Sequence, residues 1–389
     1  MGYYNTLMAI YAYFSFTKIS CSKNKSNRKI LTFLFLLPAF ILVAFRDINV
    51  GTDTITYHRG YTFLPISNGL FNVIKNARME PGYVFLSYLF KKAGLSFYVF
   101  QFFIALFLFV MLYKFICNYS CNIGFSCFLF VATSTMFSFM NIVRMMMAGV
   151  ILINSIKYIE NRNFKKFFFS ALFASLFHTS ALIFLLLYPI SIMKDKLLYK
   201  AEIIAGSIIM ALFSGPLFRF ITRITGMYGG YLESSYFDNE NHIAVYLGLL
   251  IDLAFFILLS IYRKSYLDTS DISMDYRQLN GSLNNSKAIS TEKEPISIEY
   301  ITYMSIIITI GIDIIGLTNA IMGRISGYFS LLYLILIPKL MKVIKPKKTA
   351  IFIQICIMVL LYIKLLIITV YRPGWNSAVP YNFFWDTIY

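Results

Sequence analysis

Apolar runs long enough to cross a membrane recur along almost the whole of this chain. The sequence has 389 residues and is 58% hydrophobic, and short polar segments separate the runs. About 20 apolar helical residues span the hydrocarbon of a bilayer, and there the backbone must satisfy its own hydrogen bonds. We therefore predict an all-α polytopic membrane protein, a single membrane domain over residues 1–389 with about 11–12 transmembrane or half-spanning helices.

Basic residues set the orientation of these helices. The net charge of +17 comes from lysine and arginine that lie mostly in short loops between apolar runs. Basic loops stay in the cytoplasm, so the segment with Lys23, Lys25 and Arg28 is predicted to be cytoplasmic and the N-terminus external. Membrane orientation accounts for the charge without nucleic acid, and we predict no nucleic-acid partner.

Alternation across the membrane then assigns the longer polar segments. We predict external loops over residues 46–95 and 216–242, and a flexible cytoplasmic loop over 263–295, the most polar segment. Proline follows Glu80 directly, which predicts a helix start, because proline suits the first helical turn and an acid suits its positive end. This helix, to about Ala93, is too short to span, so we expect it to lie flat at the outer interface.

The apolar stretch 167–193 is long, and His178 with the two hydroxyl residues after it interrupts the stretch. A single crossing would place Lys194 and every later basic loop outside. Two shorter helices that meet near His178 keep these loops in the cytoplasm. His178 is then expected at a depth where non-helical backbone is tolerated only around a cavity.

Arginine gathers on the predicted outer side, whereas the cytoplasmic loops are rich in lysine. The planar guanidinium group captures phosphate oxygens in pairs, so we expect these arginines to bind a diphosphate. The expected substrate-binding arginines are Arg46, Arg144, Arg324, Arg219, Arg223 and Arg372. They could neutralise a departing diphosphate, as a divalent metal does elsewhere, and no pattern of metal ligands is evident. We predict no metal and no cofactor.

Other side chains on the outer side suit glycosyl transfer. A hydroxyl acceptor needs a base, and Asp53, Glu80 and His178 are the expected catalytic residues. A lone histidine between apolar helices is, however, more often a packing residue. Tyr57 and Tyr83 offer flat faces to a sugar ring, although aromatic residues at a membrane edge more often form the interfacial belt.

Short motifs in these segments resemble the EpsG family of exopolysaccharide and O-antigen polymerases, which is related in role to the Wzy polymerases. The motifs are Phe45-Arg46, Gly51-Thr52-Asp53-Thr54 with Tyr57, Glu80-Pro81-Gly82-Tyr83, Asn141-Ile142-Val143-Arg144 with Ala148, Phe177-His178-Thr179-Ser180-Ala181, Arg324 with Tyr328-Phe329, and Val379-Pro380-Tyr381. They cover the chain from about residue 40 to its end. Met145 departs from the family pattern, which commonly has glutamine after the arginine.

The resemblance implies a membrane glycosyltransferase that joins lipid-linked repeat units at the periplasmic face of the bacterial inner membrane. The growing polysaccharide, an exopolysaccharide or the O-antigen of lipopolysaccharide, would move from its undecaprenyl diphosphate carrier onto a new unit. The implied partners are undecaprenyl-diphosphate-linked oligosaccharide, membrane lipid, and the chain-length regulator and flippase of the same pathway.

Two other classes stay open on the sequence alone. A lipid-linked oligosaccharide flippase or another transporter would need charges near the midplane, for which Asp252, Asp313 and Lys364 are the candidates. An acyltransferase could use His178 as its base, but it leaves the arginines of the outer side unexplained.

Overall fold

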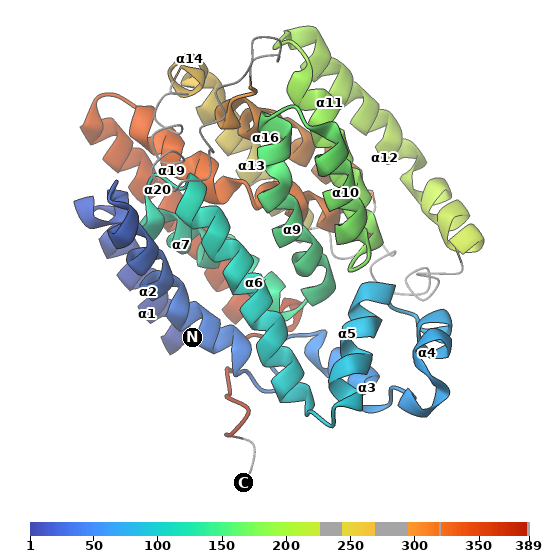
Figure 1. Ribbon diagram of the computed structural model, residues 1–389. Helices are drawn as coiled ribbons and strands as arrows, with labels where there is room; N and C mark the ends of the chain where they lie inside the picture. The colour runs from blue at the N-terminus through green and yellow to red at the C-terminus, as the bar shows by residue number, and fades with distance from the viewer. Residues whose placement is uncertain (226–242, 269–294, 319, 387–389) are drawn as a thin grey trace, which may run out of the picture.

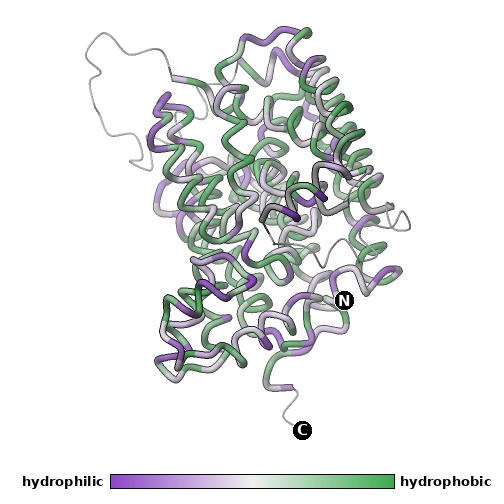
Figure 2. Tube along the Cα trace, turned by 90° about the vertical axis from the view of Figure 1, so that its right-hand side faces the viewer, coloured by the Kyte–Doolittle hydropathy of each residue, from purple (hydrophilic) through white to green (hydrophobic). Residues whose placement is uncertain are grey.

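The protein is described from a computed structural model over residues 1–225, 243–268, 295–318 and 320–386. Within these residues the chain is helical apart from turns, loops and one isolated bridge between Arg46 and Phe383. The helices pack into one bundle, and Figure 2 shows it mostly hydrophobic along the long helices, with hydrophilic residues gathered toward the two ends. The predicted all-α polytopic membrane fold is confirmed.

Five described helices are long and apolar enough to cross a membrane. They are α2 (Lys25–Ala44), α6 (Phe97–Tyr119), the Leu197–Pro216 part of α12 (Leu197–Thr225), α16 (Ile298–Gly316) and α20 (Lys347–Leu366) with its continuation to Tyr371. A sixth is the pair Arg324–Ser330 and α19 (Tyr333–Val343), which bends by 48°. Other helices pack among them: α1 (Gly2–Ser15), α7 (Ile123–Ala132), α8 (Thr135–Met140), α9 (Val143–Glu160), α10 (Phe164–Ser175), α11 (Leu187–Ile192) and α13 (Ile243–Ile261).

One end of the bundle carries a group of short helices. These are α3 (Thr54–Thr62), α4 (Leu70–Asn76) and α5 (Pro81–Lys92), and the C-terminal segment lies at the same end (Figure 1). The helix predicted after Glu80 is α5, with proline at its first position. The helices α3 and α4 were not predicted, because they are short and their apolar residues follow no clear period.

The stretch around His178 contains two helical segments, as predicted. The helix α10 ends at Ser175, His178 is extended, and the 3-10 helix η3 (Thr179–Leu186) leads into α11. Because α10 packs against both η3 and α9, the break at His178 lies beside the start of α9. The fold thus places a non-helical histidine next to another helix terminus.

The second predicted external loop begins later than the sequence indicated. The helix α12 continues through Pro216 as far as Thr225, since a proline can bend a helix without ending it. The start of the predicted cytoplasmic loop is also helical, over α14 (Arg263–Leu267). The remainder of these two predicted loops, residues 226–242 and 269–294, lies outside the described residues.

Candidate active site

A buried carboxylate at the start of α5 joins three distant parts of the chain. Glu80 is 1% exposed, and its Oε2 accepts a hydrogen bond from Nη1 of Arg144, the second residue of α9. Its Oε1 lies 2.7 Å from Nδ1 of His178 and 3.4 Å from the backbone nitrogen of Thr179. Three predicted site residues therefore meet at one group.

Close backbone packing holds α5 against the segment that carries His178. The amide of Gly82 donates to the carbonyl oxygen of Leu176 at 2.8 Å. A Cβ at position 82 would lie 2.7 Å from this oxygen, which is nearer than real Cβ contacts allow. Glycine after the proline is therefore required for the approach that brings Glu80 to His178.

The charge on Glu80 is stabilised by its partners. Burial alone would raise the pKa of this carboxyl, but the hydrogen bond with His178 and the positive charge of Arg144 outweigh burial and lower the pKa to about 2. Glu80 is consequently ionised at neutral pH and cannot serve as a general acid. It can orient His178 and hold positive charge beside it.

Asp53 interacts electrostatically with both Arg324 and Arg144. Partial burial raises the pKa of Asp53, and the positive charges of Arg324 and Arg144 offset this only in part. Since both guanidinium groups act on this one carboxyl, the site spans from Glu80 through Arg144 to Asp53 and Arg324. Five of the predicted site residues are therefore brought together.

Tyr57 and Tyr83 lie beside Arg144 but are buried. The guanidinium carbon of Arg144 is 5.9 Å from the ring centroid of Tyr57, and the two tyrosine rings are 5.5 Å apart. Only 6% of Tyr57 and 4% of Tyr83 is exposed. As they lie, these rings support Arg144 by cation–π contact and packing, and they present little free face to a sugar.

Arg46 occupies a different setting from the one the sequence indicated. It is 3% exposed, and its guanidinium donates to the backbone carbonyls of Val43 and Met140. The C-terminal segment pairs with the chain on either side of it, with amide to carbonyl distances of 3.0 Å from Asp47 to Asn382 and from Phe384 to Phe45. Through these two hydrogen bonds, Arg46 connects the end of α2 to the segment before α9.

The remaining predicted arginines are on the surface. Arg219 and Arg223 are exposed on the last turns of α12, and Arg372 is exposed after α20. The structure thus divides the six arginines by setting. Arg144 and Arg324 act on Asp53, Arg46 is buried, and the other three are solvent-accessible.

Asn141, which the sequence analysis did not select as a site residue, links the segments that frame the site. Its Oδ1 accepts from Thr52 Oγ1 at 3.0 Å, and its Nδ2 donates to the carbonyl oxygen of Asn376 at 3.1 Å. Gly51 has φ of +100°, and a Cβ there would lie 2.9 Å from Asn141 Oδ1. The signals in the sequence were its place in the motif Asn141-Ile142-Val143-Arg144 and its position between apolar helices.

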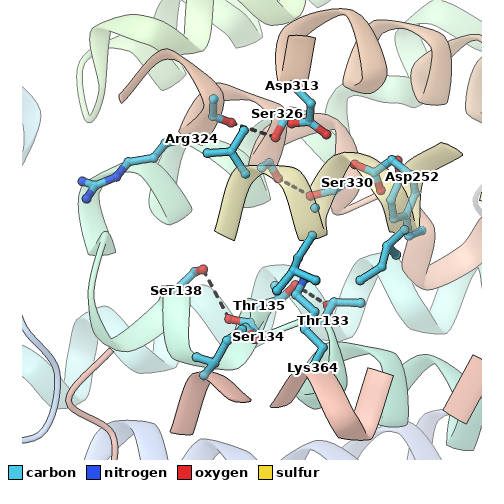
Figure 3. Close-up of a pocket in the computed structure, with 18 of the residues that line it drawn as sticks. Thr133, Ser134, Thr135, Ser138, Asp252, Asp313, Arg324, Ser326, Ser330 and Lys364 are labelled. Carbon is cyan, nitrogen blue, oxygen red and sulfur yellow. Dashed lines mark hydrogen bonds between the residues drawn. The ribbon is translucent and has the colours of Figure 1, made fainter. Parts of the chain in front are cut away.

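A cavity of about 500 Å³ lies beside Arg324. Trp375 and Asn376 of the C-terminal segment contribute to its wall, and Asp252, Asp313 and Lys364 line it among the helices. Figure 3 shows Arg324 extending away from Asp313. The serine and threonine side chains that line the cavity are Thr133, Ser134, Thr135, Ser138, Ser326 and Ser330. No group of three or more histidine, cysteine, aspartate or glutamate side chains forms a metal-binding cluster in the described part of the chain.

The fold and the site together define a polytopic α-helical membrane protein in which charged side chains from distant segments meet at one end of the bundle, with a cavity beside Arg324. Residues 29–383 match the model of the EpsG family, so the chain belongs to this family. No curated protein and no solved structure matches the chain. Membership confirms the resemblance and supports a role of the exopolysaccharide or O-antigen polymerase type.

Proposed function

We propose that this protein is a polysaccharide polymerase, a membrane glycosyltransferase that joins undecaprenyl-diphosphate-linked oligosaccharide units at the outer face of the bacterial inner membrane. The observation that carries the proposal is the contact of ionised Glu80 with both Arg144 and His178. It combines a candidate base with a phosphate-binding group in one place. Family membership supports the polymerase type of reaction, and the residue roles are inferred from the geometry.

His178 is the proposed base. Its Nδ1 faces Glu80, so Nε2 points away from the carboxylate, and the side chain is 19% exposed. With the Nδ1 proton held by Glu80, Nε2 can accept the proton of the attacking sugar hydroxyl. Glu80 acts as the positioning residue, as a carboxylate does for histidine in other acid–base pairs. Asp53, partly buried near two arginines, is the second candidate for the base.

The arginines are assigned to the leaving group. The hydroxyl oxygen forms a bond to the anomeric carbon, the bond from this carbon to the diphosphate oxygen breaks, and undecaprenyl diphosphate departs with the electron pair. Arg144 and Arg324 stabilise the developing negative charge, so the reaction as proposed needs no divalent metal. The exposed Arg219, Arg223 and Arg372 attract the anionic carrier as it approaches.

The test is polymerisation by purified protein in vesicles that contain lipid-linked repeat units. We expect Arg144→Ala and His178→Ala each to lower the initial rate by about 10²-fold or more. Arg59→Ala, which changes an exposed arginine on α3 that has no assigned role, is the matched control and should retain most of the rate. Full activity of both site variants would refute the assignment.

A second readout in cells separates polymerase from flippase. A strain with Arg144→Ala should attach single repeat units to the cell surface without longer chains, because transport of the unit continues while joining stops. A flippase variant would leave no unit outside the membrane. Absence of all surface glycan in this strain, with the protein present in the membrane, would favour the transporter class.

A further inference from the structure

The chain from residue 63 to residue 92, which we call the α4–α5 unit, has a small hydrophobic core of its own at one end of the bundle (Figure 1). Val73 of α4 packs with Val84 and Tyr88 of α5, and all three side chains are buried. This cluster is separate from the main core of the bundle. The two short helices therefore pack against each other as one unit.

Large apolar side chains remain exposed on the outside of this unit. Phe63, directly after α3, is 79% exposed, and Phe71 of α4 is 78% exposed. Among the phenylalanines whose burial is described, these two are the most exposed. On α5, Phe85 and Leu89 lie one turn apart and are also exposed. Because water disfavours apolar surface of this extent, the exposed side chains indicate a face that apolar material covers.

The charged side chains on the surface of the unit are basic. Lys75 lies one turn after Phe71 on α4, Arg78 lies between the two helices, and Lys92 ends α5; all three are exposed. Glu80, the acidic residue of the unit, is buried. External loops of membrane proteins are usually poor in lysine and arginine. A basic surface at the end that the proposed function places outside therefore calls for an anionic partner.

We propose that the α4–α5 unit is a membrane-docking surface, whose phenylalanines enter the outer leaflet and whose basic side chains bind the headgroups of anionic lipids. Short helices that carry both apolar and basic side chains bind membranes in this way. An anionic glycan would meet the same basic groups. Its hydroxyls need hydrogen-bonding partners, however, and the exposed phenylalanine rings have no polar atom to offer. The exposed side chains therefore favour lipid as the partner.

This inference deepens the proposed function, on which it rests for the substrate and for the outward orientation of this end. Glu80 directly precedes α5, and Met79 packs against both the core of the unit and the main core. The depth of the unit in the bilayer therefore sets the depth of Glu80 and its partner Arg144. The diphosphate of a lipid-linked donor lies at the level of the headgroups, so docking holds the candidate site where the diphosphate arrives.

The experiment measures this depth by tryptophan fluorescence of the full-length protein in vesicles. Trp375→Phe and Trp385→Phe remove the native tryptophans, Phe71→Trp adds the reporter, and lipids brominated near the top of the acyl chains act as contact quenchers. Because interfacial helices enter a bilayer by about 5–10 Å, we expect quenching within about twofold of that for Phe352→Trp on α20, an exposed position in a spanning helix. Thr56→Trp, at an exposed position on α3 outside the unit, should be quenched much less.

Lipid composition tests the contribution of charge. A basic residue near an anionic surface strengthens binding about fivefold. Quenching in the Phe71→Trp protein should therefore be stronger with phosphatidylglycerol in the vesicles than with phosphatidylcholine alone. Lys75→Gln combined with Arg78→Gln should remove most of this difference. Equal quenching in the two kinds of vesicle would overturn the binding of anionic headgroups.

The outcomes separate docking from the proposed function. Quenching of Phe71→Trp as weak as that of Thr56→Trp overturns docking, whether or not the protein polymerises. A fluorescence change with soluble anionic polysaccharide, and none with brominated lipid, assigns the surface to a glycan and also overturns it. Strong quenching in a protein that fails to polymerise supports docking and counts against the polymerase alone. Phe63→Trp serves as the reporter if Phe71→Trp does not fold.

Discussion

Two buried glutamates in this protein each pair with a cation, yet their surroundings differ. Glu80 contacts Arg144 and His178, whose side chains remain 18% and 19% exposed. Glu299, at the start of α16, contacts Lys339, whose side chain is 9% exposed. A buried ion pair is therefore no sign of function by itself. The accessible partners of Glu80 distinguish the candidate site from a closed structural pair.

The largest expected effect comes from replacing these two glutamates in parallel. Glu80→Gln keeps the shape but removes the charge that orients His178, so the polymerisation rate per folded molecule should fall on the order of 10²-fold. Glu299→Gln should lower the amount of folded protein and leave that rate nearly unchanged. Initial rates normalised to folded protein provide the measurement. Equal losses at the two positions would contradict the distinction.

Arg28, a buried arginine, provides a second comparison between a structural charge and the charges of the candidate site. Arg28 is 0% exposed and donates to the carbonyl oxygens of Ile116, Cys117 and Ser120, at the C-terminal end of α6. Its loss removes this donor from all three carbonyls, although that of Ile116 still accepts from the Ser120 amide, so Arg28→Met should lower the free energy of unfolding by about 1–3 kcal/mol.

Thermal unfolding in detergent, followed by fluorescence, measures this effect. The rate per folded Arg28→Met molecule should stay close to wild type, unlike that of Arg144→Ala. A normal unfolding temperature combined with a lost rate would place Arg28 in the site instead.

The packing at Gly82 gives an effect of similar size on stability. Gly82→Ala places a Cβ against the Leu176 carbonyl and should separate α5 from His178, at a cost of about 1–3 kcal/mol. The matched control is Gly206→Ala in α12, where a Cβ meets nothing within 4 Å. Unfolding temperature and initial rate should both fall in the first variant and neither in the second. Unchanged values for Gly82→Ala would show that the approach is not tight.

The pH dependence of stability is the smallest expected effect. The pKa of Glu80 is about 2 in the folded protein, against an ordinary value of 4.5. Ionised Glu80 therefore stabilises the fold fully above pH 4.5, and this contribution is lost as the pH falls toward 2. The difference in unfolding temperature between wild type and Glu80→Gln should shrink over this range. A constant difference would mean that Glu80 keeps an ordinary pKa.

Arg46 and Arg144 show how far the site could be predicted from the sequence. Both were placed at the outer edge by the lengths of neighbouring apolar runs, and both lie close to the end of a helix. Only packing determines that the guanidinium of Arg46 turns inward to carbonyls while that of Arg144 reaches Glu80. Side-chain direction at a helix end depends on the neighbouring segments, which a local pattern does not contain.

The fold class followed from the sequence alone, because the lengths of apolar runs and the placement of basic residues are local properties that a bilayer constrains strongly. The helix after Glu80 and the break at His178 were local in the same sense. The meeting of these residues was not, since Glu80 is 64 positions from Arg144 and 98 from His178. Which charges converge depends on how the helices pack against one another, and only the tertiary structure decided it.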